Sequence, residues 1–174
     1  MTSQVVRNFM KQQGFPEESP DACDMHFGGL YFQPRIVGSL VVVGIVLQLL
    51  GQIVYSSALF FVLSALLWWN VLVPALNPFE QFYNRVIAAP RSKTTLPPAP
   101  GPRRFAQAMA AAFMIVAGVA VMEGWTVTAW IFEAVLVAAF SMLLFGRFCL
   151  GAYIYHLLRG EFGFANATLP WARP

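Results

Sequence analysis

Four long runs of apolar residues dominate the chain, separated by polar or proline-rich stretches. The runs cover residues 36–55, 58–76, 105–122 and 126–145. Each approaches the roughly 20 residues that a helix needs to cross the hydrocarbon core of a membrane. The pattern therefore predicts an all-α integral membrane protein with four transmembrane helices.

Very short connections separate the runs within each of two pairs. Two serines separate the first run from the second, and three residues separate the third from the fourth. Connections this short join antiparallel neighbours, so the sequence predicts two helical hairpins. The chain then divides into an N-terminal segment with an interfacial helix (1–35), a first transmembrane hairpin (36–76), an amphipathic helix with a proline-rich strap (77–104), a second transmembrane hairpin (105–158) and a tail (159–174).

Two polar stretches carry amphipathic patterns that predict helices lying in the membrane interface. The N-terminal stretch "MTSQVVRNFMKQQGF" places its apolar residues on one stripe, with Ser3 as a candidate N-cap. In "NPFEQFYNRVIAAP", Asn77 is the expected N-cap, Pro78 the first helical residue and Glu80 the acidic partner of a capping box. The expected membrane-facing side of this second helix comprises Phe79, Phe82, Tyr83 and Val86.

Composition and charge place these elements in a membrane. Apolar residues make up 58% of the chain and charged residues only 11%, whereas soluble domains carry about 25% charged residues. All eleven Lys and Arg residues lie outside the two short hairpin turns, which predicts cytoplasmic termini and a cytoplasmic central segment. The net charge of +3 then reflects topology and contact with anionic lipid, and no nucleic-acid partner is expected.

A few polar side chains fall inside the predicted spans. Glu133 lies in the fourth span, where an ionisable group is costly and often functional. Gln48 and Gln52 of the first span are expected to hydrogen-bond it, and Asn70 is expected to pair with Ser141. These residues either lock the bundle together or, if Glu133 couples ion movement, belong to a small transporter.

The sizes of the side chains predict how the spans pack. Small residues concentrate in the third run, between Ala106 and Ala120, and recur at Gly38, Gly44 and Gly51 of the first. Because small residues let helices approach closely, we expect a tight seam between the first and third spans. The large aromatic residues should then face lipid or a partner: Phe60, Phe61, Trp68, Trp69, Trp125, Trp130, Phe132 and Phe140.

The stretch "GRFCLGAYIYHLLRG" holds Cys149 and His156, two helical turns apart. We expect both on a helical continuation of the fourth span, at the cytoplasmic headgroups. Cys23 and His26 are predicted on the same side, so the four residues could form a metal or redox site. The alternative is a cysteine and a histidine that are simply packed or solvated at a helix end.

The same stretch contains "AYIYH", which resembles the Ala-x-x-x-His arrangement of bacterial light-harvesting polypeptides. The resemblance implies bacteriochlorophyll as a cofactor, with His156 as its ligand and Ala152 leaving room for the macrocycle.

Three stretches together resemble the bacterial membrane-protein family known as domain of unknown function 4395. They are "NPFEQFYNRVIAAP", "PPAPGPRRFAQAMA" and "FGRFCLGAYIYHLL". The resemblance runs from about Gln33 to Gly160 and implies a four-span membrane fold without an established activity. Many members have a second cysteine three residues after the first, where this chain has Ala152, and the departure argues against two-thiol chemistry.

These observations favour a non-catalytic accessory subunit of a larger complex in a bacterial inner membrane, cytoplasmic or intracytoplasmic. The complex would be a photosynthetic reaction-centre and light-harvesting assembly or a respiratory one. Other membrane subunits, contacting the aromatic residues and the tails, and lipids are the expected partners. The alternatives are a membrane thiol-redox or metal-binding protein using Cys149 and a small transporter.

Overall fold

The computed structural model describes residues 4–15, 28–91 and 95–172, and within these ranges the chain forms helices and no strands. Four helical segments are long and apolar enough to cross a membrane: Gly28–Leu49, Ile53–Leu72, Gly101–Met122 and Thr126–Leu144. The predicted all-α, four-span fold is therefore confirmed, and the chain is a multi-pass membrane protein.

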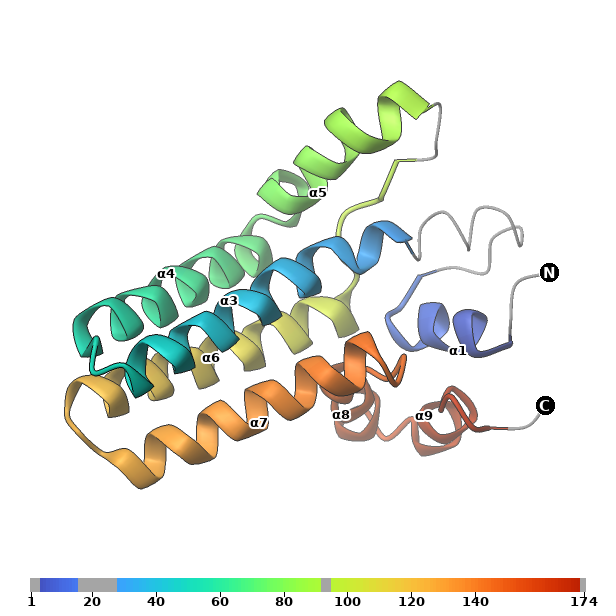
Figure 1. Cartoon of the computed structure of the whole chain (residues 1–174). Helices are drawn as coiled ribbons and strands as arrows, with labels where there is room; N and C mark the ends of the chain where they lie inside the picture. The colour runs from blue at the N-terminus through green and yellow to red at the C-terminus, as the bar shows by residue number, and fades with distance from the viewer. Residues whose placement is uncertain (1–3, 16–27, 92–94, 173–174) are drawn as a thin grey trace.

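The spanning helices form an up-down-up-down bundle (Figure 1). They are α3 (Phe32–Leu49), α4 (Ile53–Leu72), α6 (Gly101–Met122) and α7 (Thr126–Leu144). Helices α3 and α6 each pack against both α4 and α7, and lie diagonally across from one another. We call the end with the two tight turns the hairpin end, and the opposite end, where α3 and α6 begin, the terminal end.

The first tight turn lies several residues earlier than the predicted serine pair. Helix α3 ends because Gly51 adopts a φ of +75°, and the N–H of Gln52 donates back to the carbonyl of Leu47 at 2.9 Å. This is the Schellman ending that glycine permits. The serine pair belongs to the first turn of α4, where the Ser56 hydroxyl donates to the carbonyl of Gly44 at 2.8 Å.

The tightest helix pair is α4 with α6, so the predicted seam between the first and third spans is wrong. Phe60 is fully buried, against the expectation that it faces lipid. Its ring occupies space left by the missing side chain of Gly44, and a Cβ on Gly118 would approach Phe60 and Phe61 to 3.3 and 3.0 Å. Small residues therefore admit aromatic rings instead of bringing two small-residue faces together.

The other predicted lipid-facing aromatics divide into two groups. Trp68, Trp69, Trp125 and Trp130 are exposed on the bundle, as predicted, whereas Phe61, Phe132 and Phe140 are half-buried.

Shorter helices cover and extend the terminal end. They are α1 (Gln4–Gln12), a 3₁₀ turn (Pro74–Leu76), α5 (Pro78–Phe82), a π-helical turn (Tyr83–Ala88), a second 3₁₀ turn (Ala89–Arg91), α8 (Leu150–Leu158) and α9 (Phe162–Ala167). The predicted cap of α5 is confirmed, since Asn77 Oδ1 accepts the N–H of Phe79 at 3.0 Å. Within the predicted apolar face of this segment, Tyr83 is buried, Phe79 half-buried, and Phe82 and Val86 exposed.

Helix α1 was predicted at the membrane interface, but its apolar stripe packs on protein. Val6, Phe9 and Met10 are buried in one cluster with Tyr31 and Ala152. The two ends of the chain meet here, because the Asn8 side-chain amide donates to the carbonyl of Leu169 at 3.1 Å.

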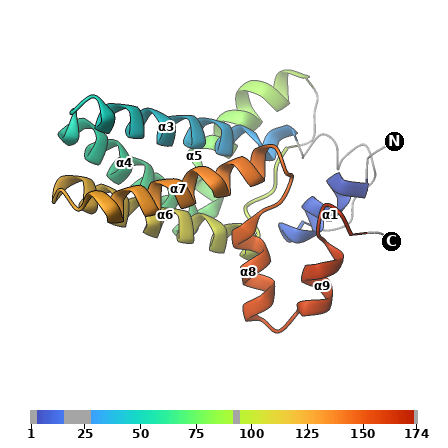
Figure 2. The ribbon, with the colours of Figure 1, turned by 60° about the horizontal axis from the view of Figure 1, so that its bottom comes forward.

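Helix α8 is a separate element and does not continue α7 as predicted. The helical conformation ends after α7, because Arg147 has a φ of +51°. The N–H of Phe148 donates to the carbonyl of Met142 at 3.2 Å. Helix α8 then turns away from the direction of α7 and runs beside α9 (Figure 2). It packs on α6 at Gly151, where an added Cβ would lie 2.6 Å from the Ala106 Cα.

The ending of α3 gives a test of the revised turn. We expect Gly51→Ala to lower the free energy of unfolding by about 1 to 2 kcal/mol, because an L-residue is strained at this φ. Thermal unfolding in detergent measures the change. Gly163→Ala, at a helical position in α9 where the added Cβ meets nothing within 4 Å, is the control and should not destabilise. Equal stability of Gly51→Ala and the parent chain would contradict the assignment.

Candidate functional site

Polar side chains from three elements form a hydrogen-bonded chain at the terminal end. Asn77 begins α5, Gln33 lies in the first turn of α3, and Gln107 lies in the second turn of α6. Asn77 Nδ2 donates to Gln33 Oε1 at 3.3 Å, and Gln107 Nε2 donates to the same oxygen at 3.1 Å. All three side chains are buried. The chain of amides therefore ties α3, α5 and α6 together.

The helix cap fixes the direction of every bond in this amide chain. Asn77 Oδ1 accepts the backbone N–H groups of Phe79 and Glu80, so its other side-chain atom must be the amino group. Gln33 must then present its oxygen to Asn77, and Gln107 must present its amino group to Gln33. Gln107 Oε1 is left buried without a hydrogen-bond partner among the described residues.

A buried ion pair lies beside the amide chain. Arg103 Nη2 lies 3.4 Å from Glu80 Oε1, and both side chains are almost fully buried. Burial raises the pKa of Glu80 above its ordinary value, and the charge of Arg103 acts in the opposite direction. This contact is long for a hydrogen bond. No other described residue accepts a hydrogen bond from the guanidinium group of Arg103, so its remaining N–H groups are available to an acceptor.

Cys149 is the residue before α8, not a residue within a long helix. Its backbone N–H donates to Gln12 Oε1 at 2.9 Å, which joins α1 to the start of α8. Burial raises the pKa of the Cys149 thiol, although the backbone N–H of Ala152 and the charge of Arg103 act in the opposite direction. Because the thiolate is the reactive form of cysteine, this environment disfavours thiol chemistry.

His156 is buried and contacts oxygen atoms through both ring nitrogens. Nδ1 lies 2.6 Å from Glu161 Oε2 and Nε2 lies 3.1 Å from the carbonyl of Gln12. A bacteriochlorophyll ligand would require a free ring nitrogen, so His156 would have to leave one of these oxygens. Ala152, its predicted companion, is fully buried.

Cys23 and His26 lie outside the described residues. Within the described ranges, no three His, Cys, Asp or Glu side chains are grouped so that they could hold a metal ion.

The predicted polar contacts inside the membrane do not form. Glu133 is buried, and neither carboxyl oxygen has a hydrogen-bond partner among the described residues. Gln52 lies exposed in the hairpin turn, whereas Glu133 is about 10 Å further along α7. Gln48 Oε1 and both polar atoms of Asn70 also lack partners in the described structure. An ionised carboxylate is costly in such a site.

Gln12, Gln33 and Gln107 were not predicted from the sequence. Gln12 and Gln33 lie at helix ends and Gln107 in the second turn of α6, where glutamine is an ordinary helix residue. The available signal was that Gln33 and Gln107 fall near the starts of two spans, and hence at the same level of the bundle.

Comparison with known families confirms the family that was predicted from the sequence. The family model described as "Domain of unknown function (DUF4395)" matches residues 32–159, and the chain belongs to this family. Searches of curated proteins and of solved structures found no match.

The contact between His156 and Glu161 predicts a pH-dependent packing of α9. The hydrogen bond from His156, followed by the charge of Arg159, lowers the pKa of Glu161 below its ordinary value of 4.5. A lowered folded-state pKa stabilises the fold above the ordinary value and loses that effect as the pH falls through the folded-state pKa. We expect hydrogen exchange, corrected for intrinsic rates, to show loss of protection in α9 under acid conditions.

Glu161→Gln should reduce α9 protection already at neutral pH and flatten its acid response. Glu123→Gln, in the exposed turn at the hairpin end, is the matched control and should behave as the parent chain does. An unchanged acid response in Glu161→Gln would show that another group controls the packing.

Proposed function

We propose that this member of the family is a non-catalytic accessory subunit of a larger bacterial membrane complex, photosynthetic or respiratory. The main support is a set of large, exposed apolar side chains on the segments outside the four spanning helices, two at the turn between α8 and α9 and one near the start of α8. Leu158, Phe162 and Trp171 are 73%, 60% and 70% exposed. We call these three residues the apolar tail surface. Large aromatic side chains of this kind anchor protein interfaces, because burial on a partner removes them from water.

Contacts with the rest of the protein hold the C-terminal segment in place as far as Trp171. Trp171 packs against Phe148 with ring centroids 6.0 Å apart, and Tyr153 donates to Asn166 Oδ1 at 3.1 Å. These contacts link the C-terminal segment and α9 to the start of α8. A surface held in place binds a partner with a smaller loss of conformational entropy than a mobile tail does.

The alternative functions have less support in the same geometry. Cys149 is buried and its raised pKa favours the unreactive thiol. Neither carboxyl oxygen of Glu133 has a hydrogen-bond partner among the described residues to which it could pass a proton. The accessory role requires neither thiol nor carboxylate chemistry.

We further propose that the terminal end faces the cytoplasm of a bacterial inner membrane. Every Lys and Arg in the described ranges belongs to a segment at the terminal end, and the two hairpin turns carry only Glu123 as a charged residue. This asymmetry follows the positive-inside rule. Membrane-impermeant thiol labelling tests it: in intact spheroplasts, a cysteine introduced at Glu123 should react and one at Phe162 should not. The reverse pattern would contradict the orientation.

The apolar tail surface gives the test of the accessory role. After mild solubilisation of native membranes, we expect the chain to migrate with a larger particle, and the double variant Leu158→Ser/Phe162→Ser to migrate alone. The substitutions remove exposed apolar anchors without touching the buried core. Native electrophoresis and the mass of the particle measure the change, and its absorption spectrum distinguishes a photosynthetic from a respiratory assembly.

Val127→Ser/Ile131→Ser is the matched control on the exposed, lipid-facing side of α7, and it should stay with the particle. If the parent chain migrates as a lone monomer, the accessory role is wrong. If the double variant stays in the particle, the apolar tail surface does not join the chain to its partner, and the support for the accessory role is lost.

A further inference from the structure

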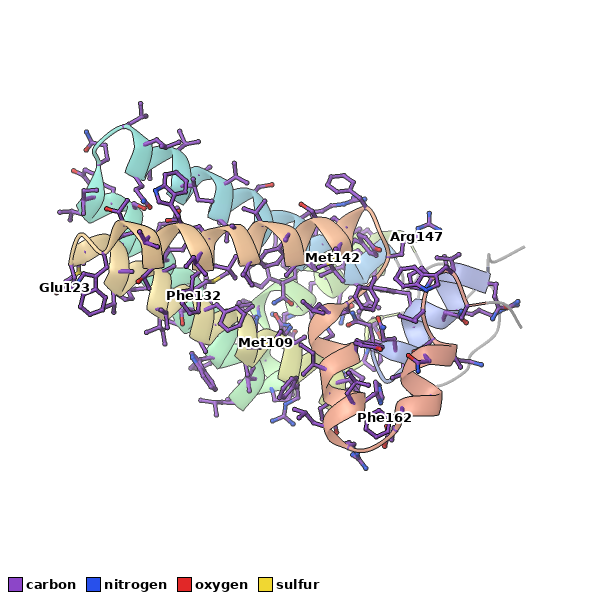
Figure 3. All side chains as sticks on the ribbon, turned by 90° about the horizontal axis from the view of Figure 1, so that it is seen from below. Met109, Glu123, Phe132, Met142, Arg147 and Phe162 are labelled. Atoms are coloured by element: carbon purple, nitrogen blue, oxygen red, sulfur yellow. The ribbon has the colours of Figure 1, made fainter. Side chains whose placement is uncertain are left out.

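A cavity of about 100 Å³ lies between α3, α6 and α7 in the part of the chain that the structure describes. Its walls are mainly apolar and include Val37, Phe113, Leu136 and Phe140. Figure 3 shows α6 and α7 diverging from the level of Phe132 toward Met109 and Met142. Phe113 and Phe132 meet edge to face, with centroids 5.4 Å apart, where the two helices are still close.

The divergence of the two helices opens the cavity toward the lipid. Val135 of α7 lines the cavity and is 38% exposed, and Met109 of α6 lines it and is partly exposed. An apolar chain inside the cavity could therefore continue sideways into the bilayer. At the terminal end, Leu150 and Gly151 of α8 belong to the lining and close the cavity.

The polar lining residues lie at that closed end. Arg103 is the one formally charged residue among the described residues that line the cavity. The polar lining residues that accompany it are Gln13, Tyr31, Gln33, Gln107 and Cys149. Arg103 is the third residue of α6 and lies at the start of this span. In a spanning helix this position corresponds to the level of the lipid headgroups.

The hydrogen-bonding requirements at the closed end are complementary. Arg103 has guanidinium N–H groups beyond the one that faces Glu80, and these require an acceptor. Gln107 Oε1 is buried and has no partner in the described part of the chain, and because the cap of α5 fixes the orientation of its amide, it requires a donor. A ligand that satisfies both must offer an acceptor oxygen to Arg103 and a donor group to Gln107, next to an apolar chain. A phosphate that carries a hydroxyl-bearing group meets both requirements, and its charge is complementary to that of Arg103.

We propose that this cavity binds a phospholipid with an anionic, hydroxyl-bearing headgroup of the phosphatidylglycerol class. The phosphate accepts hydrogen bonds from Arg103, a glycerol hydroxyl donates to Gln107 Oε1, and one acyl chain leaves between α6 and α7. This inference uses no part of the apolar tail surface and stands independently of the accessory role.

The test compares two lipids with identical acyl chains on the purified, delipidated full chain. Phosphatidylglycerol should remain bound in native mass spectrometry and raise the midpoint of thermal unfolding, whereas phosphatidylcholine, which lacks the hydroxyl and carries no net charge, should do so weakly. Gln107→Leu should weaken phosphatidylglycerol binding roughly ten- to a hundredfold, since it removes a buried hydrogen bond at the headgroup.

Arg103 is tested as the double variant Arg103→Met/Glu80→Gln, so that no carboxylate is left buried without its partner. We expect the same loss of preference for phosphatidylglycerol. Ala139→Phe fills the apolar part of the cavity without changing the polar end and should also lose binding. Ala139→Leu replaces it if the larger side chain prevents folding. Val127→Phe, on the exposed face of α7, is the matched control and should bind as the parent chain does.

Soluble glycerol phosphate distinguishes a lipid from a free phosphate ester. We expect it to bind weakly, because it leaves the apolar walls uncovered. If it binds as tightly as the lipid and Ala139→Phe does not change its binding, the site takes a free phosphate compound and the lipid proposal is wrong. Equal binding of both lipids, unchanged by Gln107→Leu, would show only unselective coating of the protein and would also overturn the proposal.

Discussion

In a helix bundle surrounded by hydrocarbon, a buried polar side chain finds no water, so its hydrogen bonds must run to other side chains or to the backbone. At the terminal end this constraint acts through a single residue. Asn77 uses its oxygen to cap α5 and can therefore only donate to Gln33, which in turn can only accept from Gln107. A cap at the start of a five-residue helix thus sets the orientation of amides on two spanning helices. It also leaves the Gln107 side-chain oxygen without a donor from any described residue.

In the middle of the bundle the helices are held together mainly by the fit of large side chains against small ones, whereas at the terminal end they are held together by hydrogen bonds between polar side chains. Lipid tails are as apolar as the helix surfaces, so the hydrophobic effect does not drive the spanning helices together. Close packing has to hold them together instead. The buried Phe60 packs against α3 because Gly44 leaves room for its ring, and Gly118 of α6 leaves room for the ring of Phe61 and the Cβ of Phe60. The Ser64 hydroxyl adds a bond from α4 to the carbonyl of Ala111 at 2.8 Å. Glycine and phenylalanine therefore form one packing unit, and the helices pair large residue against small.

The sequence predicted those features that depend on local pattern. Length and hydropathy predicted four spans, and the order of Asn77 and Pro78 predicted the cap of α5. Features that depend on which helices are neighbours were not predictable in the same way. Small residues indicated a close approach but not its partner, so the seam was assigned to α3 instead of α4. The turn at Gly51 was missed because apolar residues continue on both sides of it, and the break before α8 was missed because "GRFCLG" reads as helix.

The break before α8 gives the terminal end its chemical character. Had α8 continued α7, its first residues would have run away from the bundle, and the space beside Arg103 would have been open to water and headgroups. Instead, Gly151 lets α8 pack against Ala106 of α6, and the start of α8 closes the cavity from below. Beside the start of α8, the cavity is lined by Arg103, whose only described partner is Glu80, 3.4 Å away, and by Gln107, whose amide oxygen has no partner among the described residues. Leaving such groups unsatisfied costs about 1 to 3 kcal/mol each. The proposed lipid headgroup would remove this cost, while its acyl chain would cover the apolar walls of the cavity.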